Sequence, residues 1–274
     1  MYLLGMSRKK EIVPPPKYED TRHILMGLDV STATIGITIM IDDGTPYGHI
    51  VELTHVSPKV PGKIKGVEAL LLKKRIFKEY VSKFKTLGIT DVVIEEPLLR
   101  SNNVNTVGTL LRFNGMISDC VYEELGVVPV YISSHDARMY SFPQLMSVRK
   151  YDKKGEQYSF KKIMKELDEG SFTLFGAYPW EVDKKTIMWE LVSKEFSEIA
   201  WVTDKEGELK KENFDATDSY VACLGWINLQ KHGPLEFSTG NIKHYEINGG
   251  EDTVIEFDVQ YWDRTEHRKI YCNH

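Results

Sequence analysis

Four acidic residues stand where packing alone gives little reason for them. Asp29 and Glu95 each end a short apolar run, LMGL and VVI, and Asp215 and Asp218 lie three residues apart in NFDATDSYVACLGW. Acidic residues are poor strand formers, and a buried carboxylate costs free energy unless it is paired or binds a metal. Because side chains at i and i+3 share one face of a helix, the last two acids can act together.

These residue types predict a metal site with oxygen ligands. Carboxylates without accompanying Cys or His favour Mg²⁺, with Mn²⁺ as a substitute. Two such ions, about 4 Å apart, can activate water and stabilise the leaving oxygen of a phosphodiester in an in-line displacement. Each residue alone has a structural explanation: Asp29 can cap a turn, Glu95 can end a strand in solvent, and DxxD on a helix is usually solvated. Their conjunction favours a two-metal nuclease.

The surrounding pattern indicates which elements position these acids. Residues 24–41 predict two β-strands joined by a polar turn at Ser31–Thr34, because apolar and polar residues alternate. Further strands are expected near 48–56, 91–96 and 127–132. Apolar residues at helical spacing predict helices over 67–87, 107–125, 183–199 and 214–229, with Gly88, Gly126 and the capping residue Asp183 as boundaries.

Strands come first, and helices and strands then alternate, which is typical of an α/β fold with a mixed sheet and helices on its faces. We expect residues 1–22, with three successive prolines, to be a flexible lead, and residues 23–234 to form the main domain. An insertion is expected at about 143–180. Residues 235–274 alternate between apolar and polar residues around Ile255–Tyr261 and predict a small β-rich extension.

Charge is distributed unevenly along the 274 residues. The net charge is −5, yet residues 59–85 hold nine basic side chains against two acidic ones, and residues 149–165 hold seven against two. Basic segments beside an acidic site suit an enzyme that grips a phosphate backbone, although lysines also simply solvate helix faces. Phe160 and Phe172, with Phe175 and Tyr178, can stack on unpaired bases or pack the insertion, and packing is favoured.

The sequence also predicts location. It contains no apolar run long enough to span a bilayer, and its apolar start is too short for a secretory signal. Three widely spaced cysteines form neither a disulfide framework nor a zinc pattern. These features predict a cytoplasmic protein.

Three motifs together resemble those of the RuvC family of Holliday-junction resolvases, within the RNase H-like nuclease superfamily. MGLDVSTATIGITIM is similar to the first motif, DVVIEEPL to the second and NFDATDSYVACLGW to the last. The stretch TVGTLLRFNGMISDCVYEELGVVPVYISSHDARM is similar to phage-encoded members. The resemblance covers about residues 24–230 without the insertion.

The resemblance implies a five-stranded mixed sheet flanked by helices, and Asp29, Glu95, Asp215 and Asp218 as catalytic acids that bind two Mg²⁺ ions. It implies a homodimer that acts on branched DNA, cutting four-way junctions with paired nicks that leave 5′-phosphate ends. Host cytoplasm is the expected location of a phage-encoded member. The candidate DNA-binding residues are Lys73, Lys74, Arg112, Arg138, Lys184 and Lys185. Many bacterial members carry an aromatic residue shortly after the second-motif Glu, where this chain has Leu98 and Leu99.

Three alternatives remain open at this stage. Another RNase H-like nuclease acting on RNA–DNA hybrids, forks or flaps needs the same acids. The stretch GLDVSTATIGI also looks like the phosphate-binding hairpin of actin-like kinases and ATPases, which need a second such domain. A DNA-binding or scaffold protein without catalysis is the third.

Overall fold

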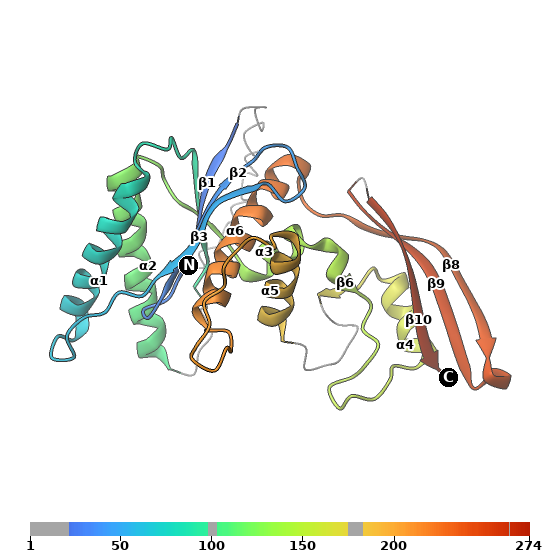
Figure 1. Ribbon diagram of the computed structural model, residues 1–274. Coiled ribbons are helices and arrows are strands. Elements are labelled where there is room, and N and C mark those ends of the chain that lie inside the picture. Colours follow the sequence, from blue (N-terminus) through green and yellow to red (C-terminus); the bar gives the residue numbers. More distant parts are fainter. Residues whose placement is uncertain (1–21, 98–102, 175–182, 263) are drawn as a thin grey trace, which may run out of the picture.

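A five-stranded mixed sheet forms the centre of the protein (Figure 1). The computed structural model describes residues 22–97, 103–174, 183–262 and 264–274. The strands are β1 (Ile24–Val30), β2 (Ile35–Ile41), β3 (His49–Val56), β4 (Asp91–Glu95) and β5 (Val130–Ile132), in the order β3-β2-β1-β4-β5. β1 is antiparallel to β2 and parallel to β4, and β4 is parallel to β5. The predicted RNase H-like fold class is confirmed.

Helices cover both faces of this sheet (Figure 1). α1 (Gly66–Val81) and α2 (Val104–Leu125) pack on one face around Phe77, Phe113 and Ile117. α3 (Ser134–Ser141), α5 (Lys184–Glu195) and α6 (Glu212–His232) pack on the other. Short 3-10 turns lie at Ser82–Phe84, Pro143–Leu145 and Asn248–Gly250. No helix in the described part of the chain is both long and apolar enough to cross a membrane.

Local sequence signals explain most helix boundaries. The Asp183 side chain accepts a hydrogen bond from the Lys185 backbone N–H at 3.0 Å, which confirms its predicted capping role. α2 ends at Gly126 with φ of 73°, a left-handed conformation that glycine adopts at little cost. Asn103 caps the start of α2 by accepting from the backbone N–H groups of Asn105 and Thr106.

Two strand glycines let α6 approach the sheet. A Cβ atom on Gly27 would lie 2.0 Å from the Ser219 carbonyl oxygen, and one on Gly36 would lie 2.0 Å from the Asp215 carbonyl oxygen. Gly225 of α6 instead lies against the Ala137 backbone of α3, where an added Cβ would lie 2.5 Å from the carbonyl oxygen.

The expected insertion and the C-terminal tail build one further unit, which we call the appended lobe (residues 143–174 and 235–274). The tail forms an antiparallel sheet of β8 (Phe237–Ile247), β9 (Asp252–Tyr261) and β10 (Arg264–Asn273). The insertion supplies β6 (Met146–Ser147), α4 (Phe160–Asp168) and β7 (Thr173–Leu174). Ile163 and Leu167 of α4 share a core with Ile255, Phe257 and Ile270 of the sheet.

The aromatic residues of the insertion that lie in the described ranges are used for packing. Phe160 contacts His244 and His274 with ring centroids at 5.1 and 5.6 Å, and Phe172 contacts Phe237 at 5.2 Å. The packing interpretation is therefore confirmed for Phe160 and Phe172, whereas Phe175 and Tyr178 lie outside the described residues.

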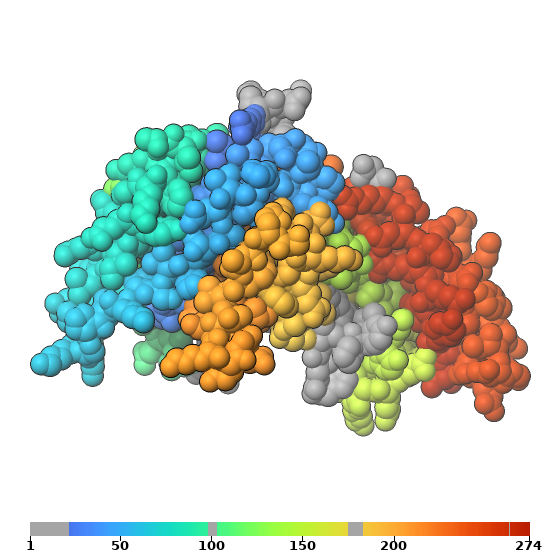
Figure 2. Space-filling view, viewed as in Figure 1, coloured from blue at the N-terminus to red at the C-terminus, as the bar shows by residue number. Residues whose placement is uncertain are grey.

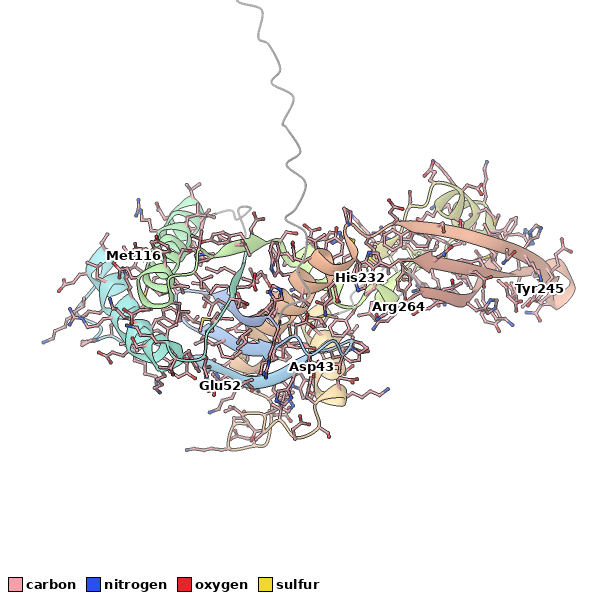
Figure 3. The ribbon with its side chains drawn as sticks, turned by 90° about the horizontal axis from the view of Figure 1, so that it is seen from above. Asp43, Glu52, Met116, His232, Tyr245 and Arg264 are labelled. Carbon is pink, nitrogen blue, oxygen red and sulfur yellow. The ribbon has the colours of Figure 1, made fainter. Side chains whose placement is uncertain are left out.

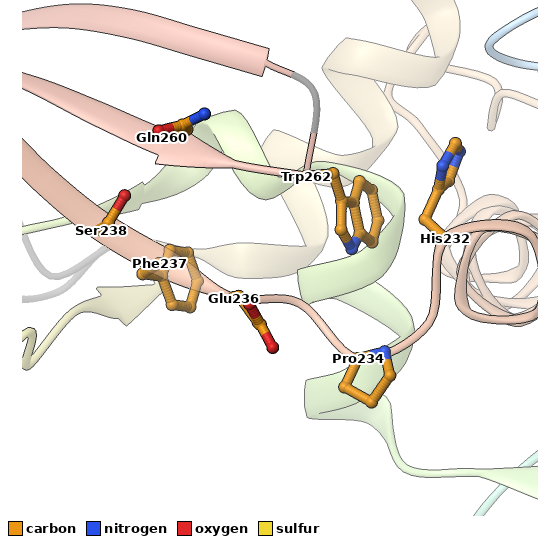
Figure 4. Close-up of a pocket in the computed structure, with 7 residues that line it drawn as sticks. All are labelled: His232, Pro234, Glu236, Phe237, Ser238, Gln260 and Trp262. Atoms are coloured by element: carbon orange, nitrogen blue, oxygen red, sulfur yellow. The ribbon is translucent and has the colours of Figure 1, made fainter. Parts of the chain in front are cut away.

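Trp262 joins the appended lobe to the core built around the central sheet. Its indole lies between Tyr140 of α3 and His232 of α6, with ring centroids at 6.2 and 4.8 Å. A pocket of about 530 Å³ opens beside it, lined also by Pro234, Glu236 and Gln260 (Figure 4). Within the lobe, Arg268 of β10 ties the tail to the insertion by donating hydrogen bonds to the carbonyl oxygens of Gln144, at 2.7 Å, and Met146.

The lobe makes the protein elongated. Seen from above, Met116 of α2 lies near one end and Tyr245 of β8 near the other (Figure 3). The space-filling view shows the red tail beside the yellow-green insertion, on the opposite side of the molecule from α1 (Figure 2).

Candidate nuclease active site

The four acids lie together at the end of the central sheet where β1 and β4 finish. Leu28 pairs with Ile94 in the parallel β1–β4 ladder, so Asp29 and Glu95, the residues that follow, lie at the same level. Asp215 and Asp218 occupy the first turns of α6, which rests on β1 and β2 through Gly27 and Gly36. Asp218 is buried, with 2% of its surface exposed. The geometry brings together all four acids that the motifs predict.

This crowding disfavours negative charge. Burial, followed by the charges of Asp218 and Asp215, raises the pKa of Asp29 to about 7. Burial, followed by the charges of Asp29 and Asp218, also raises the pKa of Glu95 well above its ordinary value. The pKa of Asp215 is raised chiefly by burial. The site thus carries more negative charge than its own surroundings neutralise.

Two cations lie among the acids. The Lys185 Nζ atom of α5 lies 3.0 Å from Asp218 Oδ2 and 3.4 Å from Asp215 Oδ1. An Arg138 terminal nitrogen of α3 lies 3.4 Å from Asp218 Oδ1, and the buried Arg138 Nε has no hydrogen-bond partner among the described residues. Burial alone lowers the pKa of Lys185, but the charges of Asp218, Asp29 and Asp215 outweigh it, so the pKa is raised.

The donor set fits divalent metal ions chemically. All four candidate ligands are carboxylates, and only two cations, Lys185 and Arg138, lie among them. Within the described ranges, however, no three His, Cys, Asp or Glu side chains adopt a metal-binding arrangement. Lys185 bridges Asp215 and Asp218, so metal binding requires this side chain, which is 46% exposed, to withdraw.

The other candidate DNA-binding residues occupy varied positions. Lys73 of α1 donates a hydrogen bond to the Thr32 carbonyl oxygen, in the turn that follows β1. Lys74 instead pairs with Asp119 and Glu123 at 2.6 and 3.7 Å and so links α1 to α2. Arg112 is exposed on α2. The described structure thus uses Lys74 in ion pairs between α1 and α2.

Lys184 belongs to a further group of positive charges. Burial lowers its pKa, and the nearby guanidinium groups of Arg138 and Arg149 lower it further. Arg149 comes from the insertion, and the sequence pattern did not single it out. Only its place within the basic segment 149–165 pointed to it.

Two open grooves flank the turn between β1 and β2. One, of about 800 Å³, lies between this turn, Lys185 and the start of α6, and includes Lys210 and Lys211. The other, of about 430 Å³, lies between Ser31, Thr32 and the α2 residues Asn105, Thr106 and Thr109. Both grooves include Ser31, two residues from Asp29, and the larger groove also includes Asp215.

No protein-family model matches the chain, and no curated protein matches it. Twenty-nine chains of solved structures do match. The Thermus thermophilus RuvC structure is 13% identical with a TM-score of 0.44, and T. thermophilus RuvC in complex with Holliday junction substrate is 8% identical with a TM-score of 0.43. Both comparisons cover 77% of this chain and 96% of the other. An Aquifex aeolicus PPX-GPPA enzyme is 13% identical over 45% of this chain and 42% of that one, with a TM-score of 0.30.

Proposed function

We propose that the protein is a divalent-metal-dependent DNA endonuclease that resolves four-way junctions by paired phosphodiester hydrolysis, leaving 5′-phosphate ends. The observation that carries the proposal is the group formed by Asp29, Glu95, Asp215 and Asp218, whose charge exceeds what Lys185 and Arg138 neutralise. A purely structural role does not explain why four carboxylates share one partly buried edge of the sheet, since burial of unbalanced charge is unfavourable.

The chain's own residues have distinct tasks in this proposal. Asp29, Glu95, Asp215 and Asp218 would hold Mg²⁺ or Mn²⁺, which when bound supplies Lewis acidity toward water and the leaving oxygen. Arg138 is held beside Asp218 and presents a fixed positive charge to a phosphate. Lys185, once displaced from Asp215 and Asp218, carries its charge on a flexible stem that can follow the phosphate through the transition state.

The DNA strand would cross the edge of the sheet along the two grooves beside the β1–β2 turn. Lys185, Lys210 and Lys211 lie in one groove among the acidic residues Asp183, Asp204, Glu212 and Asp215, and Thr32 and Thr106 supply hydroxyl donors in the other. Backbone phosphates accept both kinds of contact, which position DNA without reading its sequence.

Paired nicks require two active sites, and we place the dimer contact on the exposed side of α2. On α2, Leu111 is 43% exposed and Tyr122 is 55% exposed. Tyr131 on β5 is 41% exposed, and Val128 just before this strand is 72% exposed. A Cβ atom added to Gly115, between Leu111 and Tyr122, would meet nothing within 4 Å, so a second helix can approach closely. Replacing Leu111 by Glu is expected to convert a dimer to a monomer in sedimentation equilibrium.

Cleavage of a labelled synthetic four-way junction tests the function directly. The junction is incubated with Mg²⁺ or with EDTA beside linear duplex, fork and RNA–DNA hybrid controls. Symmetric, Mg²⁺-dependent nicks confined to the junction support the proposal. Preferential cutting of the hybrid or fork would retain the metal site but assign the protein to another class of RNase H-like nuclease, and cleavage that persists in EDTA would contradict the metal site.

A further inference from the structure

The appended lobe presents a basic surface, which we call the basic edge. It consists of the seven basic residues of the insertion: Arg149, Lys150, Lys153, Lys154, Lys161, Lys162 and Lys165. Lys153 and Lys154 lie in the loop before α4, and Lys161 is on the exposed side of α4. In Figure 1 this loop hangs along the lower side of the molecule, the same side as the start of α6 with its two acids.

The basic edge is held in place by packing. α4 is fixed to the sheet of the lobe through Ile163 and Leu167, both fully buried or nearly so. The lobe is fixed to the core through Trp262, which contacts Tyr140 and His232, and the hydrogen bonds of Arg268 hold the tail and the insertion together within the lobe. The lysines therefore keep a defined direction relative to the acids, unlike the charges of a flexible tail.

Positive charge continues from the lobe toward the active site. Arg149 follows the buried Val148 and lies near Lys184, which in turn lies near Arg138, the partner of Asp218. Like charges repel when they are brought together in one region, and a bound polyanion removes this cost. Arg138, Lys184 and Arg149 thus lead from Asp218 to the start of the segment of the insertion that holds Lys153 and Lys154.

Acidic neighbours offset part of this charge. Asp152 lies near Lys154 and Lys162, and Glu166 lies near Arg149 and Lys162. Lys165 pairs with Glu169 at 3.6 Å, but both side chains are mostly exposed, and such a pair contributes little. Lys153, Lys154 and Lys161 are exposed and so remain accessible to an anionic partner.

We propose that the basic edge binds a duplex arm of the DNA substrate, beyond the point of cleavage. This inference rests on the proposed nuclease function. The lysines are spread along a loop and one side of a helix, which suits the repeated phosphates of a duplex backbone. Phe160 and Phe172 are engaged in packing and provide no platform for stacking bases, so the surface fits double-stranded rather than single-stranded DNA.

The test compares two doubly neutralised proteins. Lys153→Gln/Lys154→Gln removes charge from the basic edge, and Lys194→Gln/Lys243→Gln removes the same charge from exposed positions on α5 and β8 outside it. Fluorescence anisotropy in EDTA gives the affinity for a labelled junction over a series of salt concentrations. The first variant should bind about fivefold more weakly per lysine at about 0.15 M salt, and its salt slope should fall by about two. The second should match the wild type.

Arm length separates a direct contact from a general charge effect. On a junction with arms cut too short to reach the lobe, wild type and Lys153→Gln/Lys154→Gln should bind equally. The inference is overturned if the salt slope is unchanged, if both variants lose affinity equally, or if the loss persists on short arms.

The nuclease proposal fails separately. If the wild type binds the junction but does not cut it with Mg²⁺, the proposed function is wrong while anisotropy still reports on the basic edge. If the wild type binds neither junction nor plain duplex, both proposals are wrong. Circular dichroism of each variant checks that exposed lysines were replaced without loss of fold.

Discussion

The Lys185 ammonium nitrogen lies 3.0 Å from Asp218 Oδ2 and also contacts Asp215 at 3.4 Å, so one lysine joins the two acids of α6. This contact reduces the repulsion between the acids, and it places a cation where a divalent ion would have to compete. Lys185 has the exposure and the stem length to yield that place.

Replacing Lys185 by Gln should therefore raise the affinity of the DNA-free protein for Mn²⁺. A partly exposed ion pair contributes about 1 kcal/mol, so the expected gain is roughly fivefold. Isothermal titration calorimetry measures this without any need for cleavage. Lys194→Gln, at the other end of α5, should leave Mn²⁺ affinity unchanged, and a weaker affinity in Lys185→Gln would show that the lysine supports metal binding.

Asp29→Asn should leave junction binding intact and abolish cleavage. The substitution keeps the shape of the side chain but removes a charge proposed to hold metal, and we expect a rate loss of roughly a thousandfold or more. Asp91→Asn is a matched control, because Asp91 begins β4 at the opposite end of the strand from Glu95. Wild-type cleavage by Asp29→Asn would refute the site assignment.

Stability in EDTA should fall as the pH rises. The pKa of Asp29 is about 7 in the folded protein against 3.8 for an ordinary Asp, so between these values the folded state binds more protons than the unfolded state. Folding is then favoured at low pH and loses about 4 kcal/mol as the pH rises through this range.

Thermal melts at about pH 5 and about pH 8 measure the effect. Asp29→Asn should show a shallower dependence and should be more stable than the wild type at the higher pH. Mg²⁺ should raise the melting temperature more at the higher pH, since protons then compete less for the carboxylates. An identical pH dependence in wild type and Asp29→Asn would rule out Asp29 as its source.

Gly36→Ala should disrupt the site from the sheet side. The added Cβ would lie 2.0 Å from the Asp215 carbonyl oxygen, so α6 must shift and carry Asp215 with it. We expect a loss of about 2 kcal/mol or more in the free energy of unfolding, together with loss of cleavage. Gly108→Ala on α2 meets nothing within 4 Å and should stabilise the protein by about 0.5–1 kcal/mol. Chemical denaturation of both variants measures these changes in the free energy of unfolding.

Trp262→Ala should loosen the appended lobe while leaving the central sheet folded. It removes the ring that lies between Tyr140 and His232, at an expected cost of about 2 kcal/mol. Limited proteolysis should then cut the connection between α6 and β8 faster than in the wild type. Tyr245→Ala, at the far end of the lobe, should be cut at the wild-type rate.

Short-range patterns predicted the sheet and most helices, because apolar alternation and glycine stops act within a few residues. β5 shows where this fails: VVPVYI predicts a strand over 127–132, but β5 begins at Val130, because Pro129 has no N–H to donate. α5 likewise ends at Glu195, before the predicted Ile199, because Phe196 leaves the helical conformation.

Contacts between residues far apart in the sequence were harder to predict from the sequence. The motifs predicted the four acids as a set, but the bridging position of Lys185 depends on how α5 packs on α6. The pairing of Lys74 with Asp119 could not be predicted from the sequence, because it depends on how α2 packs against α1. The core shared by the insertion and the tail joins segments about ninety residues apart. The apolar residues of each segment predict that it is packed against something, but they do not show which segment it packs against. The domain boundaries stay a prediction.

That shared core also imposes an order on synthesis. α4 leaves the ribosome long before β9 and β10, so Ile163 and Leu167 have no sheet to cover them until those strands have been made. Pairings so distant in sequence form slowly, and the waiting surface is a target for chaperones and proteases. A chain that stops before residue 252 would retain every candidate catalytic acid but would leave the apolar face of α4 uncovered. We therefore expect chaperones and proteases to recognise such a truncated chain by this exposed apolar face.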